Sequence, residues 1–379
     1  MIVSLIILLS LLLGYLVLML LYRKGWRRQP VFSAPEGFKP ATFISIIIPA
    51  RNEEGNIGEC LASILSCGYP EELYEILVID DHSTDRTYEI VTAFEKSHIK
   101  CLKLKDYLDG QELNSYKKRA IEIGINNSKG DLILTTDADC TVKKDWLKTI
   151  TALYETASPV MIIGSVKFTT DRSLLAIFQS LDFMSMQGIT AAAHQLKLGN
   201  MCNGANLAFS RKAFYEVEGY KNIDYLASGD DYLLMTKMQK RFPGRLAYLK
   251  AQETIVSTLP QATWRGFLNQ RIRWASKMGK YDDKTIVAVL MLVYLFNLSF
   301  LGLFIAGFFE VYFWIFCAAM LLVKTAVELF YLGDVAAYFD KEKELRYFPF
   351  LQPLHIAYII LAGFLGFFGK YNWKGREVK

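Results

Sequence analysis

Long uncharged stretches at both ends of the 379-residue chain constrain its fold more than any other feature. Residues 2–22 contain no charged side chain and are long enough to cross a hydrocarbon core of about 30 Å. No Lys or Arg precedes this stretch and no small-x-small cleavage site follows it, which favours an uncleaved anchor over a signal peptide. Arg23, Lys24, Arg27 and Arg28 come directly after it, so the positive-inside rule places the following domain in the cytoplasm.

The C-terminal part of the chain contains three further apolar segments, Thr285–Phe309, Val311–Gly333 and Phe348–Gly369. The second segment contains Lys324 and Glu328, which lie four residues apart and therefore on one face of a helix. Because an unpaired charge is costly inside a bilayer, we expect these two side chains to pair.

The number of membrane crossings conflicts with the charge of the C-terminal tail. Four crossings and a cytoplasmic domain would place Lys370, Lys374, Arg376 and Lys379 on the outside, against the positive-inside rule. Either one C-terminal segment is re-entrant or interfacial, or helix packing overrides the rule. We expect two or three crossings after residue 284.

Between the apolar ends, four apolar runs alternate with helical patterns. This alternation predicts an α/β domain with a doubly wound, Rossmann-like sheet, in which ligands bind at the carboxyl ends of the strands. The expected strands are Phe43–Pro49, Glu75–Asp80, about 100–104 and Leu132–Thr136, and the expected helices are about 54–66, 84–96 and 115–126.

Polar residues follow the expected strands. Arg51-Asn52-Glu53 follows the first strand, Asp80-Asp81 closes the second, and Asp137 and Asp139 follow the last. A single aspartate at such a position often caps the next helix, but polar residues at three of the four strand ends favour a ligand site.

Several classes of protein are excluded. No Gly-x-Gly-x-x-Gly follows the first strand and no Gly-x-x-x-x-Gly-Lys-Ser/Thr is present, which argues against a dehydrogenase and a P-loop enzyme. The chain has 43 basic and 38 acidic residues, a net charge of only +5, so we expect no nucleic-acid partner.

Six motifs follow one another in a fixed order along the chain. They are Pro49-Ala50-Arg51-Asn52-Glu53, Asp80-Asp81-His82-Ser83-Thr84-Asp85, Thr136-Asp137-Ala138-Asp139, Gly204-Ala205-Asn206, Gly229-Asp230-Asp231 and Gln270-x-x-Arg273-Trp274. This set resembles glycosyltransferase family 2, whose members are membrane-attached inverting enzymes with a GT-A fold and include cellulose, chitin, hyaluronan and poly-N-acetylglucosamine synthases.

The apolar ends and the resemblance, which covers about residues 43–280, together predict a domain organisation. It consists of a transmembrane anchor at 1–23, a linker at 24–42, a GT-A domain at 43–258, an interfacial helix with the Gln-x-x-Arg-Trp motif at 259–284, and a C-terminal transmembrane region at 285–379.

The resemblance also implies a donor site and a metal site. Asp80 or Asp81 would hold the nucleoside, and Asp139, with Asp137 nearby, would bind Mg²⁺ or Mn²⁺ together with the donor diphosphate. The residues expected to bind the nucleotide sugar are Pro49, Arg51, Glu53, Asp80, Asp81, Lys118 and Asp137. Lys118 and its neighbour Lys117 lie in an element that approaches the diphosphate in the family, although both could equally occupy an exposed helix face.

The resemblance implies that Asp231 is the general base, with Asp230 beside it where the family usually has Glu. A neighbouring carboxylate raises the pKa of a base toward neutrality; Gly229-Asp230 could also cap the following helix. Gln270, Arg273 and Trp274 would contact the diphosphate and the acceptor sugar. Alternatively, the aromatic and basic stretch Thr263–Lys280 is only an interfacial anchor.

The expected activity is therefore that of a metal-dependent, inverting hexosyltransferase in a bacterial inner membrane, with its catalytic domain in the cytoplasm. It would transfer sugar from a nucleotide sugar, with a UDP-sugar favoured, to a polysaccharide. A lipid acceptor is the alternative, because few transmembrane segments are available to form a channel. A noncatalytic scaffold would have lost carboxylates, and all three acidic clusters are present.

Overall fold

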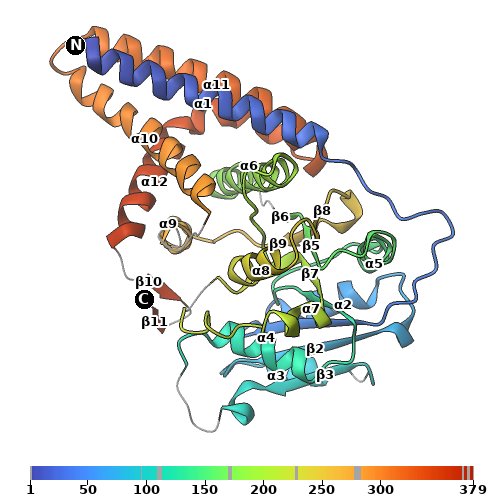
Figure 1. Cartoon of the computed structure of the whole chain (residues 1–379). Helices are drawn as coiled ribbons and strands as arrows, with labels where there is room; N and C mark the ends of the chain where they lie inside the picture. The colour runs from blue at the N-terminus through green and yellow to red at the C-terminus, as the bar shows by residue number, and fades with distance from the viewer. Residues whose placement is uncertain are drawn as a thin grey trace. The chain divides into compact units, whose positions relative to one another are not determined.

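The computed structural model describes residues 2–94, 96–108, 113–169, 173–226, 229–276, 283–368, 371–373 and 376–378 (Figure 1). The chain forms two compact units, an α/β unit of residues 30–167 and 202–259 and a helical unit of residues 1–29, 168–201 and 260–378. Of the basic residues singled out above, Lys280, Lys370, Lys374 and Lys379 lie outside the described residues.

A seven-stranded mixed sheet forms the centre of the α/β unit. In spatial order its strands are β3 (Ile99–Lys103), β2 (Tyr74–Asp80), β1 (Ile44–Ala50), β4 (Leu132–Thr135), β7 (Leu207–Ser210), β5 (Met161–Gly164) and β8 (Leu246–Leu249). The first four are parallel, and the chain runs outward from β1 to β3 before returning to β4. Such a reversal creates a crevice at the carboxyl ends of β1 and β4.

The helices of this unit are α2 (Ile57–Leu65), α3 (Thr87–Thr92), α4 (Tyr116–Asn126), α5 (Trp146–Ala157), α7 (Arg211–Glu216) and α8 (Asp230–Arg241). Short strands β6 (Val166–Phe168) and β9 (Val256–Thr258) lie outside the large sheet. Helix α4 packs directly on β1, because a Cβ added at Gly124 would lie only 2.6 Å from Ile47 Cγ2. Ile46, Ile47 and Ile48 are completely buried, as expected for a strand covered on both faces.

The predicted doubly wound α/β fold is confirmed, and all four predicted strands are present within one or two residues. Other features differ from expectation. Helices α2 and α3 begin at Ile57 and Thr87, each about three residues later than predicted. Helix α3 ends at Thr92, well before residue 96. Strand β7 is antiparallel to both β4 and β5, a pairing that no sequence pattern indicated.

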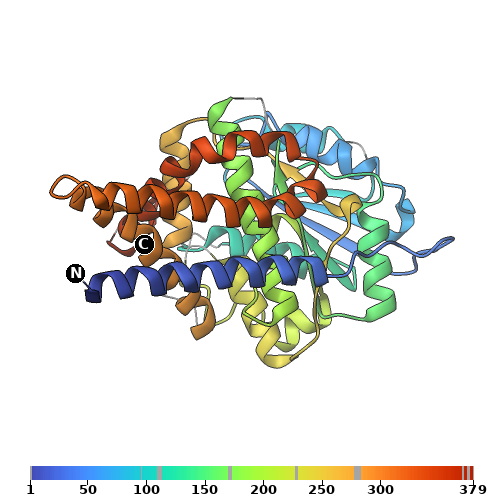
Figure 2. The same ribbon diagram turned by 90° about the horizontal axis from the view of Figure 1, so that it is seen from above.

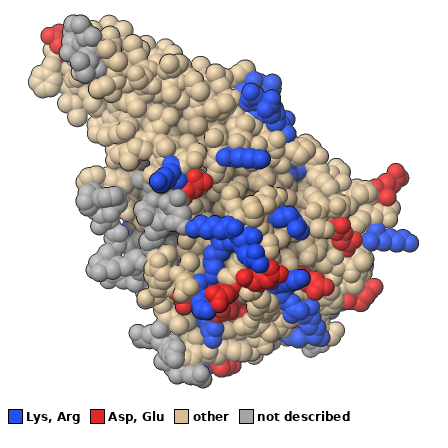
Figure 3. All heavy atoms as spheres, viewed as in Figure 1, with Lys and Arg blue, Asp and Glu red and all other residues tan. Residues whose placement is uncertain are grey.

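The helical unit contains α1 (Ile2–Arg28), α6 (Leu174–Leu196), α9 (Trp264–Ala275), α10 (Lys284–Ala306), α11 (Tyr312–Phe339) and α12 (Phe348–Phe368), followed by the hairpin of β10 (Tyr371–Trp373) and β11 (Arg376–Val378). Among the described residues, four helices are long and apolar enough to cross a membrane: Ser4–Arg28, Lys284–Ala306, Tyr312–Phe339 and Glu342–Gly366. In Figure 3 the visible face of α1, α10 and α11 consists mainly of uncharged residues.

Helices α1 and α11 lie side by side and run in the same direction (Figure 2). The Tyr15 hydroxyl donates to Glu328, and further along both helices the Trp26 indole donates to the Asp334 carbonyl at 3.1 Å. Arg27 forms an ion pair with Asp334 at 2.7 Å. The basic end of α1 therefore lies beside the C-terminal end of α11.

A buried polar cluster connects α1, α11 and α12. Lys324 Nζ donates to Glu328 Oε1 and to Gln352 Oε1, both at 2.7 Å, which confirms the predicted Lys324–Glu328 pair. Glu328 also accepts hydrogen bonds from Tyr15 and from the Gln352 amide. Each charge in this apolar region thus has hydrogen-bond partners, as burial requires.

Candidate active site

Two carboxylates lie at the end of β2. Asp80 is the last residue of the strand, is 6% exposed, and has one oxygen, Oδ1, that is buried without a hydrogen-bond partner among the described residues. Asp81 is also buried, and its backbone N–H donates to the carbonyl of Ala50 at 2.8 Å, which ties the ends of β1 and β2 together. An unpaired, buried carboxylate oxygen is costly, so Asp80 is well suited to receive a ligand donor.

Asp81 is held by cationic and polar neighbours. Arg51 Nη1 donates to the Asp81 carbonyl at 3.0 Å and lies 3.7 Å from Asp81 Oδ1. His82 Nδ1 lies 2.8 Å from the same carboxylate oxygen. Arg51, predicted as a nucleotide-binding residue, thus stands next to the Asp80-Asp81 pair.

Pro49 and Glu53 lie at the end of β1 and just before α2, respectively. Pro49 lies in β1 opposite Ile79 of β2. Glu53 Oε2 accepts a hydrogen bond from the Asn56 side chain at 2.8 Å, just before α2 begins. Both residues lie close to the turn between β1 and α2.

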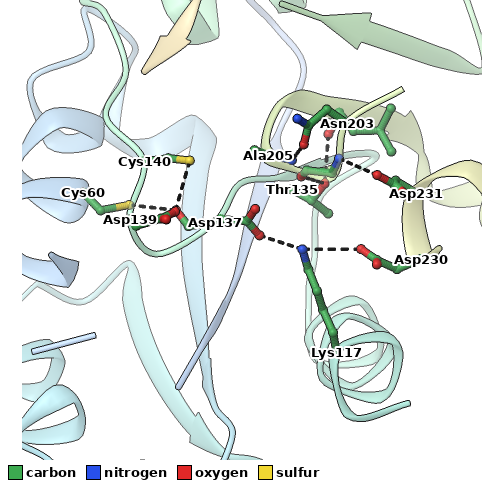
Figure 4. A network of polar contacts seen from close by, with 12 residues as sticks. Cys60, Lys117, Thr135, Asp137, Asp139, Cys140, Asn203, Ala205, Asp230 and Asp231 are labelled. Atoms are coloured by element: carbon green, nitrogen blue, oxygen red, sulfur yellow. Dashed lines mark hydrogen bonds and ion pairs between the residues drawn. The ribbon is translucent and has the colours of Figure 1, made fainter. Parts of the chain in front are cut away.

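Asp137 and Asp139 follow β4 directly, at the reversal point of the sheet, and both are half-buried. Two buried cysteines lie beside them: the Cys60 thiol donates to the Asp137 carbonyl at 3.7 Å, and the Cys140 thiol donates to Asp139 Oδ1 at 3.6 Å (Figure 4). Burial raises the pKa of Cys60 to about 12.

Asp230 and Asp231 begin α8, as the first two residues of the helix. Asp231 Oδ2 accepts from the Gly204 N–H at 3.2 Å, and Oδ1 accepts from the Tyr232 N–H at 2.7 Å. Gly204 is tightly placed, since an added Cβ would lie 3.2 Å from Asp230 Oδ2. The cap of α8 is Gly229, whose φ of 82° suits a glycine, and not the side chain of Asp230.

Lys117, in the first turn of α4, connects these two groups of carboxylates. Its Nζ donates to Asp137 Oδ1 at 2.7 Å and lies 3.6 Å from Asp230 Oδ2, as Figure 4 shows. Burial disfavours the charge on Lys117, but Asp137 and Asp230 outweigh it and raise the pKa of the ammonium above its ordinary value.

Lys118, the predicted lysine, faces elsewhere. It is 1% exposed, and its Nζ donates to the carbonyls of Ile223 and Leu226. The structure therefore brings Lys117, rather than Lys118, to the carboxylates. Consecutive helix residues point about 100° apart, so only one of the two could face the strand ends.

The carboxylates fit a divalent cation that shares its coordination with another ligand. Among the described residues, no three His, Cys, Asp or Glu side chains converge closely enough to hold a metal by themselves. Asp137 and Asp139 offer hard oxygen donors two residues apart, which suits Mg²⁺ or Mn²⁺ when phosphate oxygens complete the shell.

The Gln-x-x-Arg-Trp motif lies on α9, in the helical unit. Gln270 accepts from Arg271 at 2.6 Å, and the Trp274 ring packs against Phe183 with centroids 5.9 Å apart. Arg273, the motif arginine, is half-buried near the end of the helix.

Two family models match the chain. The model described as "Glycosyl transferase family 2" matches residues 45–218, and the model described as "Glycosyl transferase family group 2" matches residues 132–366, more than half of the chain. The chain belongs to glycosyltransferase family 2. The resemblance identified from the motifs is thereby confirmed.

Relatives within family 2 match over part of their length. Glycosyltransferase AglE of Haloferax volcanii is 29% identical over 189 residues, covering 50% of this chain and 59% of AglE. The poly-beta-1,6-N-acetyl-D-glucosamine synthase of Staphylococcus epidermidis is 27% identical over 240 residues, covering 61% of this chain and 53% of the synthase. The chain thus spans only about half to three fifths of the length of these relatives.

A solved structure shows the same fold as this family 2 chain. The mannosyltransferase PcManGT from Pyrobaculum calidifontis, in complex with GDP-Man and Mn²⁺, aligns with a TM-score of 0.56 at 19% identity, covering 95% of this chain and 97% of that one. This likeness confirms the GT-A fold predicted for the chain.

Proposed function

We propose that this protein is an inverting, metal-dependent hexosyltransferase that transfers sugar from a nucleotide sugar to a growing polysaccharide. The acceptor hydroxyl attacks C1 of the donor sugar, and the bond from C1 to the diphosphate oxygen breaks. The nucleoside diphosphate leaves with the electron pair, and the acceptor proton passes to the enzyme. One displacement of this kind inverts the configuration at C1.

The observation that carries the proposal is the position of Lys117 between Asp137 and Asp230. One fixed cation links the carboxylates after β4, which suit a metal, to the carboxylates at the start of α8, which suit a base. Lys117 is thereby placed to interact with the departing diphosphate, whose negative charge grows as the bond breaks.

Asp231 is the proposed general base. The N–H groups of Gly204 and Tyr232 orient its carboxylate, and an aspartate held in this way can receive a proton from a hydroxyl in hydrogen-bond reach. Asp230, turned toward Lys117, positions that cation and is the secondary member of the pair.

Asp139 and Asp137 are the proposed metal-binding residues, and Asp80 and Asp81 the proposed nucleoside-binding residues, with Arg51 keeping Asp81 in place. When bound, Mg²⁺ or Mn²⁺ would neutralise the leaving diphosphate. The Mn²⁺ in the PcManGT complex supports the metal assignment, and its GDP-Man supports a nucleotide-sugar donor. Gln270, Arg273 and Trp274 are proposed to contact diphosphate and acceptor.

The preference for a polysaccharide acceptor rests on the similarity to the poly-beta-1,6-N-acetyl-D-glucosamine synthase. A UDP-sugar is the proposed donor because the motif resemblance favours it. Since PcManGT binds GDP-Man, the donor test must also include GDP-sugars.

The test is release of nucleoside diphosphate by detergent-solubilised protein from UDP-, GDP- and dTDP-sugars, with and without Mn²⁺ or Mg²⁺, beside Asp231→Asn. We expect metal-dependent turnover of one donor, reduced at least about 100-fold in the variant. Product size then separates a polysaccharide from a single transfer to lipid. Absence of turnover across the panel, with lipid and oligosaccharide acceptors added, would instead support a scaffold.

A further inference from the structure

We propose that Asp182 of α6 is a positioning residue for the Gln-x-x-Arg-Trp motif, acting through Arg271. Arg271 occupies one of the two positions that the motif pattern leaves open. The inference rests on the proposed function, because it assigns to Asp182 the task of orienting side chains that would contact the acceptor.

Asp182 and Arg271 form a buried ion pair in which two guanidinium nitrogens approach one carboxylate oxygen. Arg271 Nε donates to Asp182 Oδ2 at 2.9 Å, and Nη2 lies 2.6 Å from the same oxygen. The two side chains are only 4% and 3% exposed. The planar guanidinium holds a fixed direction when two of its nitrogens meet one carboxylate.

Arg271 passes this orientation to both ends of the motif. Its Nη1 donates to Gln270 Oε1 at 2.6 Å, and its guanidinium carbon lies 4.3 Å from the centre of the Trp274 ring. On the preceding turn the same group lies 4.6 Å from the centre of the Phe267 ring. Gln270 and Trp274 are therefore fixed by one guanidinium.

Asp182 has additional partners on α12, which makes it a junction of three helices. The Tyr358 hydroxyl donates to Asp182 Oδ1, and His355 Nε2 lies 3.6 Å from that oxygen. Burial alone would raise the pKa of Asp182, but Arg271, His355 and Tyr358 together lower it to about 2. The carboxylate thus remains charged at any working pH.

A purely structural role would not require charges here. Buried ion pairs stabilise a fold little better than well-packed apolar side chains, because desolvation offsets their attraction. What the pair does supply is a fixed direction for Arg271, and hence for its two neighbours in the motif.

The first test is steady-state kinetics of Asp182→Asn with UDP-GlcNAc as donor and a β-1,6-linked N-acetylglucosamine oligosaccharide as acceptor. We expect the acceptor KM to rise about tenfold while the donor KM stays within about twofold, because Trp274 loses its fixed position. Partial unfolding would lower kcat and leave both KM values unchanged. Asp334→Asn is the matched control, since it removes another charge of the helical unit, the partner of Arg23 and Arg27.

The double variant Asp182→Asn/Arg271→Gln keeps the test valid if the single variant folds poorly. It leaves no unpaired buried charge, so its melting temperature should approach that of the wild type, yet the raised acceptor KM should persist. Recovery of both stability and KM in the double variant would show a structural role and overturn the proposal.

A second readout does not need turnover. Acrylamide quenching of Trp274, obtained as the difference between each protein and its Trp274→Phe counterpart, should increase at least about twofold in Asp182→Asn. Unchanged quenching would overturn the positioning role. Wild-type protein that does not turn over these substrates would count against the proposed function alone, since quenching still decides the role of Asp182.

Discussion

The ammonium nitrogen of Lys117 lies 2.7 Å from Asp137 Oδ1, so the proposed metal-binding carboxylate already has a cationic partner supplied by the chain. A divalent ion at Asp137 must share that carboxylate with Lys117. The attraction between Asp137 and either cation is weakened by the repulsion between the two cations. Metal binding and the placement of Lys117 are therefore coupled.

Lys117→Met tests this coupling. Without the competing ammonium, Mn²⁺ should bind the donor-free protein at least about fivefold more tightly, measured by titration calorimetry. Turnover should fall about 100-fold, because the fixed charge beside the leaving diphosphate is lost.

Lys118→Met is the matched control for that prediction. It removes the ammonium that donates to the carbonyls of Ile223 and Leu226. The free energy of unfolding should therefore fall by about 1–3 kcal/mol. Mn²⁺ affinity and turnover per folded molecule should remain close to wild type. Equal effects of the two substitutions on metal affinity would contradict the assignment of Lys117.

Asp80→Asn should stabilise the ligand-free protein and weaken donor binding. The change removes the charge from a carboxylate whose Oδ1 is buried without a partner among the described residues, so the free energy of unfolding should rise by about 1 kcal/mol. Nucleotide affinity should fall about tenfold, since the oxygen would accept from the nucleoside. Thermal unfolding and calorimetry measure the two effects, and loss of stability would refute the argument.

Asp85→Asn should have the opposite effect on stability. Asp85 Oδ1 accepts from the Thr87 N–H at 3.0 Å and Oδ2 from the Glu54 N–H at 3.0 Å. Burial opposes ionisation, but the Thr87 hydroxyl and these N–H groups together outweigh it and lower the pKa of Asp85. Its stabilisation is therefore complete above about pH 4 and is lost on further acidification, so the difference between wild type and variant should shrink there.

The sequence predicted the strand ends well because buried parallel strands are mainly apolar runs bordered by polar residues. Arg51 follows β1 (Ile44–Ala50), and Asp80 closes β2 (Tyr74–Asp80). It pointed to Lys118 rather than Lys117, because the directions of the two side chains depend on how α4 packs. Asp182 belongs to no motif. Its only signal was that it is the one acidic residue between Leu174 and Leu198.

The polar cluster of the helical unit should respond to single and double substitutions in opposite ways. Glu328→Gln leaves Lys324 buried without an anion and should cost about 3–5 kcal/mol. Adding Lys324→Met removes that charge, while the amide introduced by the first substitution can still bond Tyr15 and Gln352, so most of the stability should return. The fraction of protein that remains monodisperse after heating in detergent measures the stability of each variant. Losses of stability that simply add in the double variant would argue against the Lys324–Glu328 pair.

The last helix, α12, bears on the conflict between the number of crossings and the basic tail. Helices α1 and α11 run in parallel, so their C-terminal ends lie together, and α12 begins near them at Phe348. Helix α10 is joined to α11 by a short turn at the opposite end of α11, so a crossing by both helices would place the start of α10 at Lys284 on the side where α11 ends.

The C-terminal half of α12 returns toward this side. Gly363 packs on the ring of Tyr294, about 15 Å along α10 from its start. Gly366 lies against Ala275, at the end of α9 and before α10 begins, since an added Cβ would be 2.7 Å from Ala275 Cβ. In Figure 1 α12 diverges from α11 and ends near α9.

We therefore predict three crossings, with α12 lying in the membrane without spanning it. Topology reporters inserted within residues 30–42 and fused after Lys379 should report the same side, and a reporter at the exposed Phe309, between α10 and α11, should report the opposite side. The basic residues at both ends would then share one face of the membrane, as the positive-inside rule requires. Opposite signals from the first two reporters would mean that α12 crosses and that packing overrides the charge of the tail.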